Sequence, residues 1–228
     1  MALPARYAQS WEGPFRDRAQ ALFRPEIAIL DVGAGRRPTI EPSARPPGCR
    51  YVGLDISADE LAAAPDGSYD ETWVADATRR IPELEGRFDL VISFQVLEHV
   101  TPLEGAFANF RAYLRPGGHF VGQFSGTFSF FALASRLIPH RLSKWLLSHL
   151  TERPTTTIFP AHYHHCWDSA IRRSLDSWAR VEVEPRYLGA GYLRFLPPAQ
   201  RLYLIYEEWA RRSGRRNLAT HYLVSAER

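Results

Sequence analysis

Three aspartates and two glycines in the first third of the chain have the spacing of ligand-binding residues. Asp31, Asp55 and Asp76 each stand at the end of a predicted strand. Gly33 and Gly35 follow the first of these acids, and a turn built on glycine lets a ligand approach the backbone closely because glycine lacks a Cβ. An acid about twenty residues beyond such a turn can accept hydrogen bonds from both hydroxyls of a ribose. The spacing predicts a nucleoside-containing ligand.

The residues after the glycine turn argue against a dinucleotide. A dinucleotide-binding turn needs a third glycine at the position of Pro38. Residues 39–49 contain Pro42, Pro46 and Pro47, so the helix that would hold a pyrophosphate is short or broken. A ligand without phosphates fits better. A nicotinamide-dependent oxidoreductase of the Rossmann type is therefore the weaker alternative.

Four histidines are candidates for a general base. His162, His164 and His165 lie in one short segment rich in aromatic residues, and His99 lies after a predicted strand. An unperturbed imidazole titrates near neutral pH, which suits proton transfer from an acceptor hydroxyl. The three later histidines rank above His99. A purely structural loop is an equal alternative for their segment.

The elements that must position these residues alternate between short apolar strands and amphipathic helices. Predicted strands cover residues 27–32, 50–55, 71–75, 88–93, 119–124, 180–187 and 220–226. Predicted helices cover residues 58–64, 102–114, 169–178 and 197–212. Ser57 and Glu60 predict a capping box for the first of these helices. The alternation predicts one α/β domain with a mostly parallel seven-stranded sheet and helices on both faces.

Six segments, in order, resemble the motifs of the class I S-adenosylmethionine-dependent methyltransferases. They are DVGAG (31–35), GLD (53–55), ADA (75–77), FDLVIS (88–93), VLEHV (96–100) and LRPGG (114–118). The Glu-His-Val signature is similar to that of a small-molecule group in this class. The match covers residues 25–125 and continues weakly to the end of the chain. The resemblance implies a Rossmann-like fold with helical insertions after strands five and six, and S-adenosylmethionine as the cofactor.

The resemblance assigns roles around the first two strands. It implies that Gly33 and Gly35 line the methionine and ribose part of the cofactor. It implies that Asp31 organises this turn near the cofactor's amino group. It also implies that Asp55 binds the ribose hydroxyls, with Ile56 against the adenine.

The resemblance also assigns roles around the third and fourth strands. It implies that Asp76 accepts a hydrogen bond from the adenine amino group, and that Ala77 offers a backbone N–H. Phe94 and Gln95 are implied to flank the cofactor and face the acceptor. The chain departs from the family pattern at residues 36–38, where many members have another glycine and a regular helix.

Neither histidine segment predicts a metal centre. In residues 162–166 the ligands are more crowded than in a closed zinc site, and no second cluster completes them. Glu98 and His99 resemble a segment of the ubiquinone O-methyltransferases in which a further carboxylate helps to hold a divalent cation. Here Gln95 takes that position, and a neutral amide is a poor ligand for a hard cation. We therefore expect no metal.

The domain divides into a cofactor-binding half and an acceptor side. A helical arm, residues 1–24, precedes a single domain, residues 25–228, whose cofactor-binding half ends at residue 125. Tyr7 and Trp11 of the arm are expected to close over the cofactor and exclude water. Insertions at 125–168 and 189–216 are expected to form the acceptor side.

Residues 127–150 combine an apolar face with basic side chains and leave three interpretations open. They are a lid over the core, a wall of the acceptor pocket, or a helix at a membrane surface. Packing against the sheet is favoured, because apolar faces of helices usually belong to a core.

Composition places the chain among ordinary globular proteins. It has 228 residues and a formal net charge of +3, too small an excess to indicate a nucleic acid as partner. Two cysteines make no disulfide framework, and no apolar run is long enough to span a membrane. The N-terminus lacks an apolar signal core, so we expect a cytoplasmic protein.

The resulting expectation is S-adenosylmethionine-dependent O-methylation of a small-molecule, glycan or secondary-metabolite hydroxyl. Holding the acceptor in line with the sulfonium methyl group supplies much of the rate, so no covalent catalytic residue is required. The alternatives are the nicotinamide-dependent oxidoreductase and a non-catalytic relative that only binds the cofactor.

Overall fold

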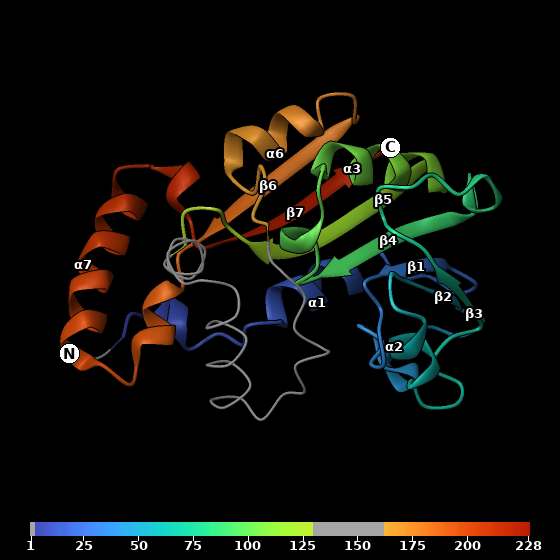
Figure 1. Ribbon diagram of the computed structural model, residues 1–228, viewed down its shortest axis with the longest axis horizontal. Helices are drawn as coiled ribbons and strands as arrows, with labels where there is room; N and C mark the ends of the chain where they lie inside the picture. Colours follow the sequence, from blue (N-terminus) through green and yellow to red (C-terminus); the bar gives the residue numbers. More distant parts are fainter. Residues whose placement is uncertain (1–2, 130–161) are drawn as a thin grey trace.

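The described part of the chain is built on one seven-stranded sheet (Figure 1). The computed structural model describes residues 3–129 and 162–228. The strands are β1 (Ala28–Val32), β2 (Arg50–Asp55), β3 (Glu71–Val74), β4 (Phe88–Phe94), β5 (Leu114–Ser125), β6 (Arg180–Arg186) and β7 (His221–Glu227). Their order is β3-β2-β1-β4-β5-β7-β6, and β7 runs antiparallel to both of its neighbours while the other pairs are parallel. The predicted mostly parallel sheet is confirmed.

Helices flank the sheet on both faces. The α-helices of the described residues are α1 (Gly13–Gln20), α2 (Ala58–Ala62), α3 (Leu103–Tyr113), α6 (Asp168–Ser174) and α7 (Pro197–Arg212). Short 3-10 helices are η1 (Ala5–Tyr7), η2 (Pro42–Ala44), η3 (Pro82–Leu84), η4 (Leu97–His99), η6 (Gly189–Leu193) and η7 (Arg216–Leu218). The prediction for α7 is confirmed to the residue. α2 ends two residues before the predicted boundary, because Pro65 disfavours a helical conformation at the residue before it.

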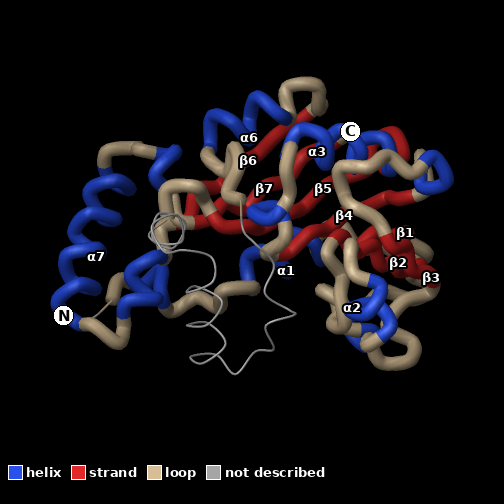
Figure 2. The backbone as a smooth tube through the Cα atoms, viewed as in Figure 1, coloured by secondary structure: helices blue, strands red, loops and turns tan. Residues whose placement is uncertain are grey.

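Two hydrophobic clusters lie on opposite faces of the sheet. Along β1, Leu30 belongs to the cluster under α3, and Ile29 to the cluster under α1. Phe107 of α3 and Phe15 of α1 are both fully buried in these clusters. Figure 2 shows α3 and α6 on one side of the sheet and α1 on the other. Since side chains alternate along a strand, β1 is buried on both faces, as a central parallel strand must be.

The carboxyl ends of the parallel strands share one edge of the sheet. β1 ends at Val32, β2 at Asp55, β4 at Phe94 and β5 at Ser125. Ser125 pairs with His221, so the first residue of antiparallel β7 lies at the same edge. Ligands of open α/β sheets bind outside this edge. Residues 130–161, and with them most of the predicted insertion at 125–168, lie outside the described residues.

β5 begins earlier than the sequence predicts. The strand starts at Leu114, which pairs with Phe88, and the pairing then moves to His119 opposite Leu90. Residues 115–118 are therefore extra residues on one strand, a bulge that contains the predicted Pro-Gly-Gly turn. α3 ends at Tyr113 and the chain is already in the sheet at Leu114, so the prediction that this turn ends the helix is wrong.

The N-terminal arm is tied to the domain at both of its helical parts. α1 begins at Gly13, with a proline in its first turn, and buries Phe15 and Ala19 against the sheet. Before it, the guanidinium of Arg6 donates to the carbonyl of Tyr187 at 2.8 Å and pairs with Glu208 at 2.9 Å. Removing the whole arm would therefore remove core side chains as well.

Candidate functional site

The glycine turn after β1 brings two other parts of the chain into contact with the backbone. Gly33 and Gly35 both have positive φ, +78° and +54°, a conformation that glycine adopts without strain. A Cβ on Gly33 would overlap the side chain of Val96, which follows β4. A Cβ on Gly35 would meet nothing closer than 3.7 Å, where a carboxylate oxygen of Asp55 lies. The missing side chain of Gly33 therefore lets Val96 pack against the turn, whereas that of Gly35 leaves space beside the carboxylate of Asp55.

Replacing Gly33 with alanine should lower the free energy of unfolding by about 2–5 kcal/mol, the sum of the costs of a left-handed residue and of an overpacked contact. Gly35→Ala is the matched control, since it adds only the cost of the left-handed conformation. The double substitution Gly33→Ala with Val96→Ala should recover part of the loss. Urea unfolding of the four proteins measures these differences, and equal losses at the two glycines would refute the packing role of Gly33.

Asp31 holds the glycine turn from inside the protein. Its side chain is fully buried. It accepts hydrogen bonds from the backbone N–H and hydroxyl of Thr39, at 2.8 and 2.7 Å, and from the hydroxyl of Tyr51 at 2.7 Å. Burial raises the pKa of the Asp31 carboxyl, and the bonds from Thr39 and Tyr51 oppose that shift. These bonds attach Thr39, after the turn, to β1 and link it through the same carboxylate to Tyr51 of β2.

Asp55 joins the glycine turn to the start of α2. Its Oδ2 accepts from the backbone N–H of Gly35 at 3.0 Å, and its Oδ1 accepts from that of Ser57 at 2.8 Å. Burial raises the pKa of the Asp55 carboxyl, and these backbone bonds oppose the shift. A carboxylate offers about four lone-pair sites, so two remain for the hydroxyls of a ribose. The predicted placement of Asp55 beside the turn agrees with its position here.

The predicted capping box is half right. Ser57 caps α2 by accepting from the backbone N–H of Glu60 at 3.2 Å. The side chain of Glu60 does not return to Ser57; it pairs with the guanidinium of Arg36 through two bonds, at 2.8 and 2.6 Å. Glu60 does not bond to the backbone N–H of Ser57 because that N–H already donates to Asp55. The planar guanidinium of Arg36 can instead donate two parallel hydrogen bonds to the Glu60 carboxylate. Arg36, where the chain departs from the family pattern, thus fastens the turn to α2.

The residues that directly follow β2 and β3 include one exposed apolar side chain, Ile56, and one acid, Asp76. Ile56, next to Asp55, exposes 61% of its surface, an apolar side chain available to stack on a flat ring. Oδ1 of Asp76 accepts both the backbone N–H and the hydroxyl of Thr78, each at 2.8 Å. Among the described residues, Oδ2 of Asp76 has no comparable bond. The backbone of Ala77 is fixed by Asn109 of α3, which donates to its carbonyl at 2.9 Å.

Gln95 leaves β4 in a strained conformation. Its φ is +57°, unusual for a residue other than glycine, and its N–H donates to the carbonyl of Gln123 at 2.7 Å. Its Oε1 accepts from the hydroxyl of Ser125 at 3.2 Å. Its Nε2 is buried and has no hydrogen-bond partner among the described residues. The preceding Phe94 lies against Phe15 of α1, with ring centroids 5.0 Å apart.

Glu98 is a buried acid beyond β4 whose pKa is shifted strongly upward. It lies in η4, with 4% of its surface exposed, and its Oε2 has no hydrogen-bond partner among the described residues. Burial raises the pKa of Glu98 to about 7, opposed in part by hydrogen bonds from Ser125. Burial raises the pKa of both Tyr163 and Tyr192 to about 12, with Glu98 adding to the shift. A carboxyl group therefore faces two phenols and a serine beyond β4 and β5.

The structure brings the rings of His164 and His165 together but does not gather all four predicted histidines at one place. The backbone N–H groups of His162 and Tyr163 donate to the carbonyl of Glu98, at 2.9 and 2.8 Å. The ring of His165 instead lies against Glu104 of α3, and the exposed ring of His164 stacks on it. His99 is partly buried in η4 beside Glu98. The loop backbone thus reaches Glu98, while two of its rings lie on α3.

His221 lies at the same edge of the sheet, although nothing in the sequence predicted it there. It is 1% exposed, and its Nδ1 has no hydrogen-bond partner among the described residues. Burial, aided by the charge of Arg186, lowers the pKa of His221 to about 3, so the ring is neutral. The hydroxyl of Tyr192 lies 3.4 Å from its Nε2, and the ring of Trp11 lies edge-on at 4.0 Å. The antiparallel pairing of β7 places His221 here, and no local sequence signal gives the direction of that strand.

Trp11 and Tyr7 of the arm lie in different surroundings. The carbonyl of Trp11 accepts from Nε2 of Gln123 on β5 at 3.2 Å, so this residue lies over the strand edge near His221. The hydroxyl of Tyr7 donates to Glu207 of α7 and accepts from the backbone N–H of Ala190 at 3.1 Å. Tyr7 therefore holds the arm against η6 and α7.

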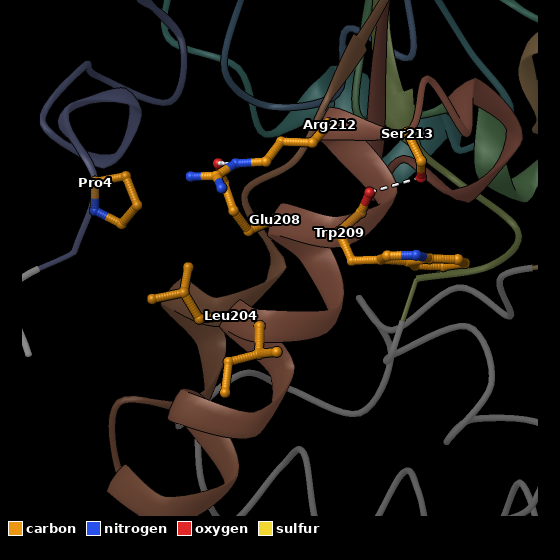
Figure 3. A pocket seen from close by; sticks show the side chains of 7 residues that line it. Pro4, Leu204, Glu208, Trp209, Arg212 and Ser213 are labelled. Atoms are coloured by element: carbon orange, nitrogen blue, oxygen red, sulfur yellow. Dashed lines mark hydrogen bonds and ion pairs between the residues drawn. The ribbon is translucent and has the colours of Figure 1, made fainter.

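A hollow of about 800 Å³ is lined by α7 and by Pro4 of the arm (Figure 3). Its lining residues are Pro4, Leu204, Ile205, Glu208, Trp209, Arg212 and Ser213. None of these belongs to the carboxyl edge of the sheet. We place the candidate site at the strand edge instead, because ligands of open α/β sheets bind there. No helix in residues 3–129 or 162–228 has the length and apolar character that crossing a membrane requires.

Known proteins resemble both the sequence and the fold. Residues 5–180 match a family model described as a methyltransferase domain. The chain is 30% identical over 113 residues to a ubiquinone biosynthesis O-methyltransferase of Brucella melitensis, covering 47% of this chain and 45% of that relative. A protein of the same name from Paramagnetospirillum magneticum is 33% identical over 110 residues, covering 46% and 44%. The match thus spans less than half of each relative's length.

Two solved structures share the fold. An S-adenosylmethionine-dependent methyltransferase from Mesorhizobium loti is 20% identical, with a TM-score of 0.59 over 97% of this chain and 100% of that one. Phosphoethanolamine N-methyltransferase 2 of Haemonchus contortus, in complex with S-adenosyl-L-methionine, is 14% identical, with a TM-score of 0.58 over 96% and 53%. The chain therefore belongs to the methyltransferase-domain family and has the Rossmann-like fold of the class I S-adenosylmethionine-dependent methyltransferases.

Proposed function

We propose that this S-adenosylmethionine-dependent methyltransferase methylates a hydroxyl oxygen of a small molecule. The observation that carries the proposal is Glu98, a buried carboxyl with a pKa of about 7 and an oxygen without a partner among the described residues. A base with a pKa near the working pH is the kind best suited to accept a proton from a hydroxyl. The O-methyltransferases among the relatives support an oxygen acceptor.

The residues around β1, β2 and β3 fit the cofactor. The site keeps space beside Gly35, two lone-pair sites on Asp55 and an exposed apolar Ile56. We propose that Asp55 binds the ribose hydroxyls, that Ile56 lies against the adenine and that Oδ2 of Asp76 accepts from the adenine amino group. When bound, the cofactor supplies a methyl group on a positively charged sulfur.

Glu98, together with the groups around it, would orient the acceptor and remove its proton. Oε2 of Glu98 accepts the hydroxyl proton as the bond between the acceptor oxygen and the methyl carbon forms. The sulfur–methyl bond breaks at the same time, and the electron pair of that bond stays on sulfur. Ser125, Tyr163 and Tyr192 surround this carboxyl with hydroxyl groups. Holding the acceptor in line with the methyl group supplies the remaining rate advantage.

We propose Glu98 as the base in preference to the four histidines. The ring of His165 is engaged by Glu104, and those of His162 and His164 face solvent. His99 remains the second candidate because it lies in the same 3-10 helix as Glu98. In either case the proton acceptor lies beyond β4, where the methyl acceptor of a class I enzyme would bind.

The acceptor classes we favour are a sugar or glycan hydroxyl, a secondary metabolite and a lipid-linked precursor, in a cytoplasmic enzyme. The expectation of peripheral membrane contact rests on a membrane-surface helix in residues 127–150, most of which lie outside the described residues. Trp11, lying beside His221 and over β5, is proposed to close the acceptor side.

Transfer of radiolabelled methyl groups from S-adenosylmethionine tests the proposal. The probes are catechol, a simple phenol and a methyl glycoside, with phosphoethanolamine as an amine control. We expect label in at least one hydroxyl probe, lost with Glu98→Gln, and none in the amine. Labelling confined to the amine would overturn the oxygen acceptor.

A further inference from the structure

Glu104, His164 and His165 bring one carboxylate and two imidazoles together at the surface near η4. The ligand atoms of the three side chains all lie within 4.8 Å of one another. Nδ1 of His165 lies 2.5 Å from Oε1 of Glu104, and the two imidazole centroids lie 3.8 Å apart. The acid comes from the first turn of α3, and the histidines from a loop some 60 residues later in the chain. None of the three side chains takes part in the proposed methyl transfer.

The loop backbone is shaped to place the two rings on the same side. In an extended chain, consecutive side chains point in opposite directions. Here Tyr163 and His165 both have positive φ, 49° and 59°, which turns the chain so that the rings of His164 and His165 stack. Each such residue costs on the order of 1 kcal/mol outside glycine, so the surrounding structure must hold the loop in place.

Hydrogen bonds on both sides of the loop hold it. Thr127 donates from its hydroxyl to the carbonyl of Tyr163 at 2.6 Å and from its N–H to that of Cys166 at 2.8 Å. The N–H groups of His162 and Tyr163 donate to the carbonyl of Glu98. The ring of Trp167 lies edge-on to that of His165, with centroids 5.2 Å apart. The imidazoles are thus presented to Glu104 by a fixed backbone.

We propose that Glu104, His164 and His165 bind a divalent transition metal of the zinc class. Two imidazoles and a carboxylate are a donor set that suits zinc, and three protein ligands leave a fourth position for water. Ligand atoms around a tetrahedral zinc ion lie about 3.4 Å apart, given bonds of about 2.1 Å. Closing the cluster therefore needs shifts of about 1 Å or more at its longest separation, which the exposed Glu104 and His165 side chains, 44% and 38% exposed, permit.

This cluster supplies the group that the sequence lacked. Residues 162–166 alone offered too few well-spaced ligands for a metal site. The fold brings a further ligand, Glu104 of α3, next to His164 and His165. The cluster is separate from Gln95, Glu98 and His99, the positions that the family resemblance would suggest. A metal here would cross-link the loop that covers Glu98 to the first turn of α3.

Titration of the untagged, chelator-treated full-length protein with Co²⁺ and then Zn²⁺ tests the proposal. We expect one Co²⁺ per chain, with a d–d absorption band that Zn²⁺ abolishes. His164→Ala, His165→Ala and Glu104→Gln should each weaken Zn²⁺ binding by at least roughly 10-fold, a loss that even outer partners of a metal ligand cause. Affinity should fall as the pH is lowered, because only neutral imidazoles bind metal.

Two variants serve as controls. His162→Ala removes an exposed histidine of the same loop and should leave binding within about twofold, within the usual scatter for a surface change. His99→Ala tests the alternative position beside Glu98. Absence of saturable binding, or binding that depends on His99 and not on His164 and His165, would overturn the site. Circular dichroism melts identify any variant that fails to fold, and Glu104→Gln with His164→Gln then replaces it.

Discussion

Replacing Asp55 with alanine should weaken the binding of S-adenosylhomocysteine roughly 100-fold, which is about 2.7 kcal/mol. The wild-type carboxylate lies beside the glycine turn and keeps two lone-pair sites for the ribose hydroxyls. Each hydrogen bond to a charged group contributes about 1.5–3 kcal/mol, so the loss of two such bonds is sufficient for an effect of at least this size. Isothermal titration calorimetry with S-adenosylhomocysteine measures it and needs no knowledge of the acceptor.

Two further variants show whether the loss is specific. Asp59→Ala removes the same charge from the exposed side of α2 and should leave affinity unchanged. Asp55→Asn keeps one oxygen acceptor and should fall between wild type and alanine. Thermal melts separate loss of binding from loss of fold. Equal affinities for wild type and Asp55→Ala would remove Asp55 from the cofactor site.

Glu98→Gln should lower kcat by about 10²- to 10⁴-fold, the usual contribution of a positioned base. Affinity for S-adenosylhomocysteine should change little, because the assigned cofactor contacts lie on β1, β2 and β3. The wild-type rate should fall as the pH drops below about 7, since the base must be ionised to accept a proton. That limb of the pH profile should vanish in the variant.

The same substitution should change stability in a pH-dependent way. Burial raises the pKa of Glu98 to about 7, so the folded state holds this proton more tightly than the unfolded chain does. The stabilising contribution is complete below the unfolded pKa near 4.5 and is lost as the pH rises through 7. A neutral glutamine avoids that loss and should raise the free energy of unfolding at pH 8 by up to roughly 3 kcal/mol.

Urea unfolding at pH 5 and pH 8 compares wild type, Glu98→Gln and Glu83→Gln. Glu83 is exposed in η3, so its variant should match wild type at both pH values. A gain for Glu98→Gln that is equal at pH 5 and pH 8 would show that Glu98 does not ionise near neutrality, and the base would have to be sought among the histidines.

The fold could be predicted closely because its signals are local. β2 is a short strand ending in an acid, and α7 is amphipathic over its whole length, so their boundaries follow from the pattern. One boundary that was predicted wrongly, the start of β5, depends on pairing with another strand. β5 begins early because Leu114 pairs with Phe88, and this pairing is not visible in either segment alone.

The residues of the candidate site also fall into those that follow from local sequence and those that depend on contacts between distant segments. Asp55 and the two glycines end or directly follow the strands that position them, so their spacing was enough to predict that they lie together. Glu98 was visible as part of a motif, but its shifted pKa comes from burial, which is a property of the fold. His221 and the pair of Glu104 with His165 arise from contacts between distant segments, in one case set by the antiparallel direction of β7.

The measurement that bears most directly on the central claim is calorimetric titration of the wild-type protein with S-adenosylhomocysteine, alongside NADH. The site at the carboxyl edge of β1, β2 and β3 predicts one molecule of S-adenosylhomocysteine bound per chain with a micromolar dissociation constant, and no binding of NADH. Absence of heat with S-adenosylhomocysteine, or equal binding of NADH, would contradict the assignment of this edge to a sulfonium cofactor.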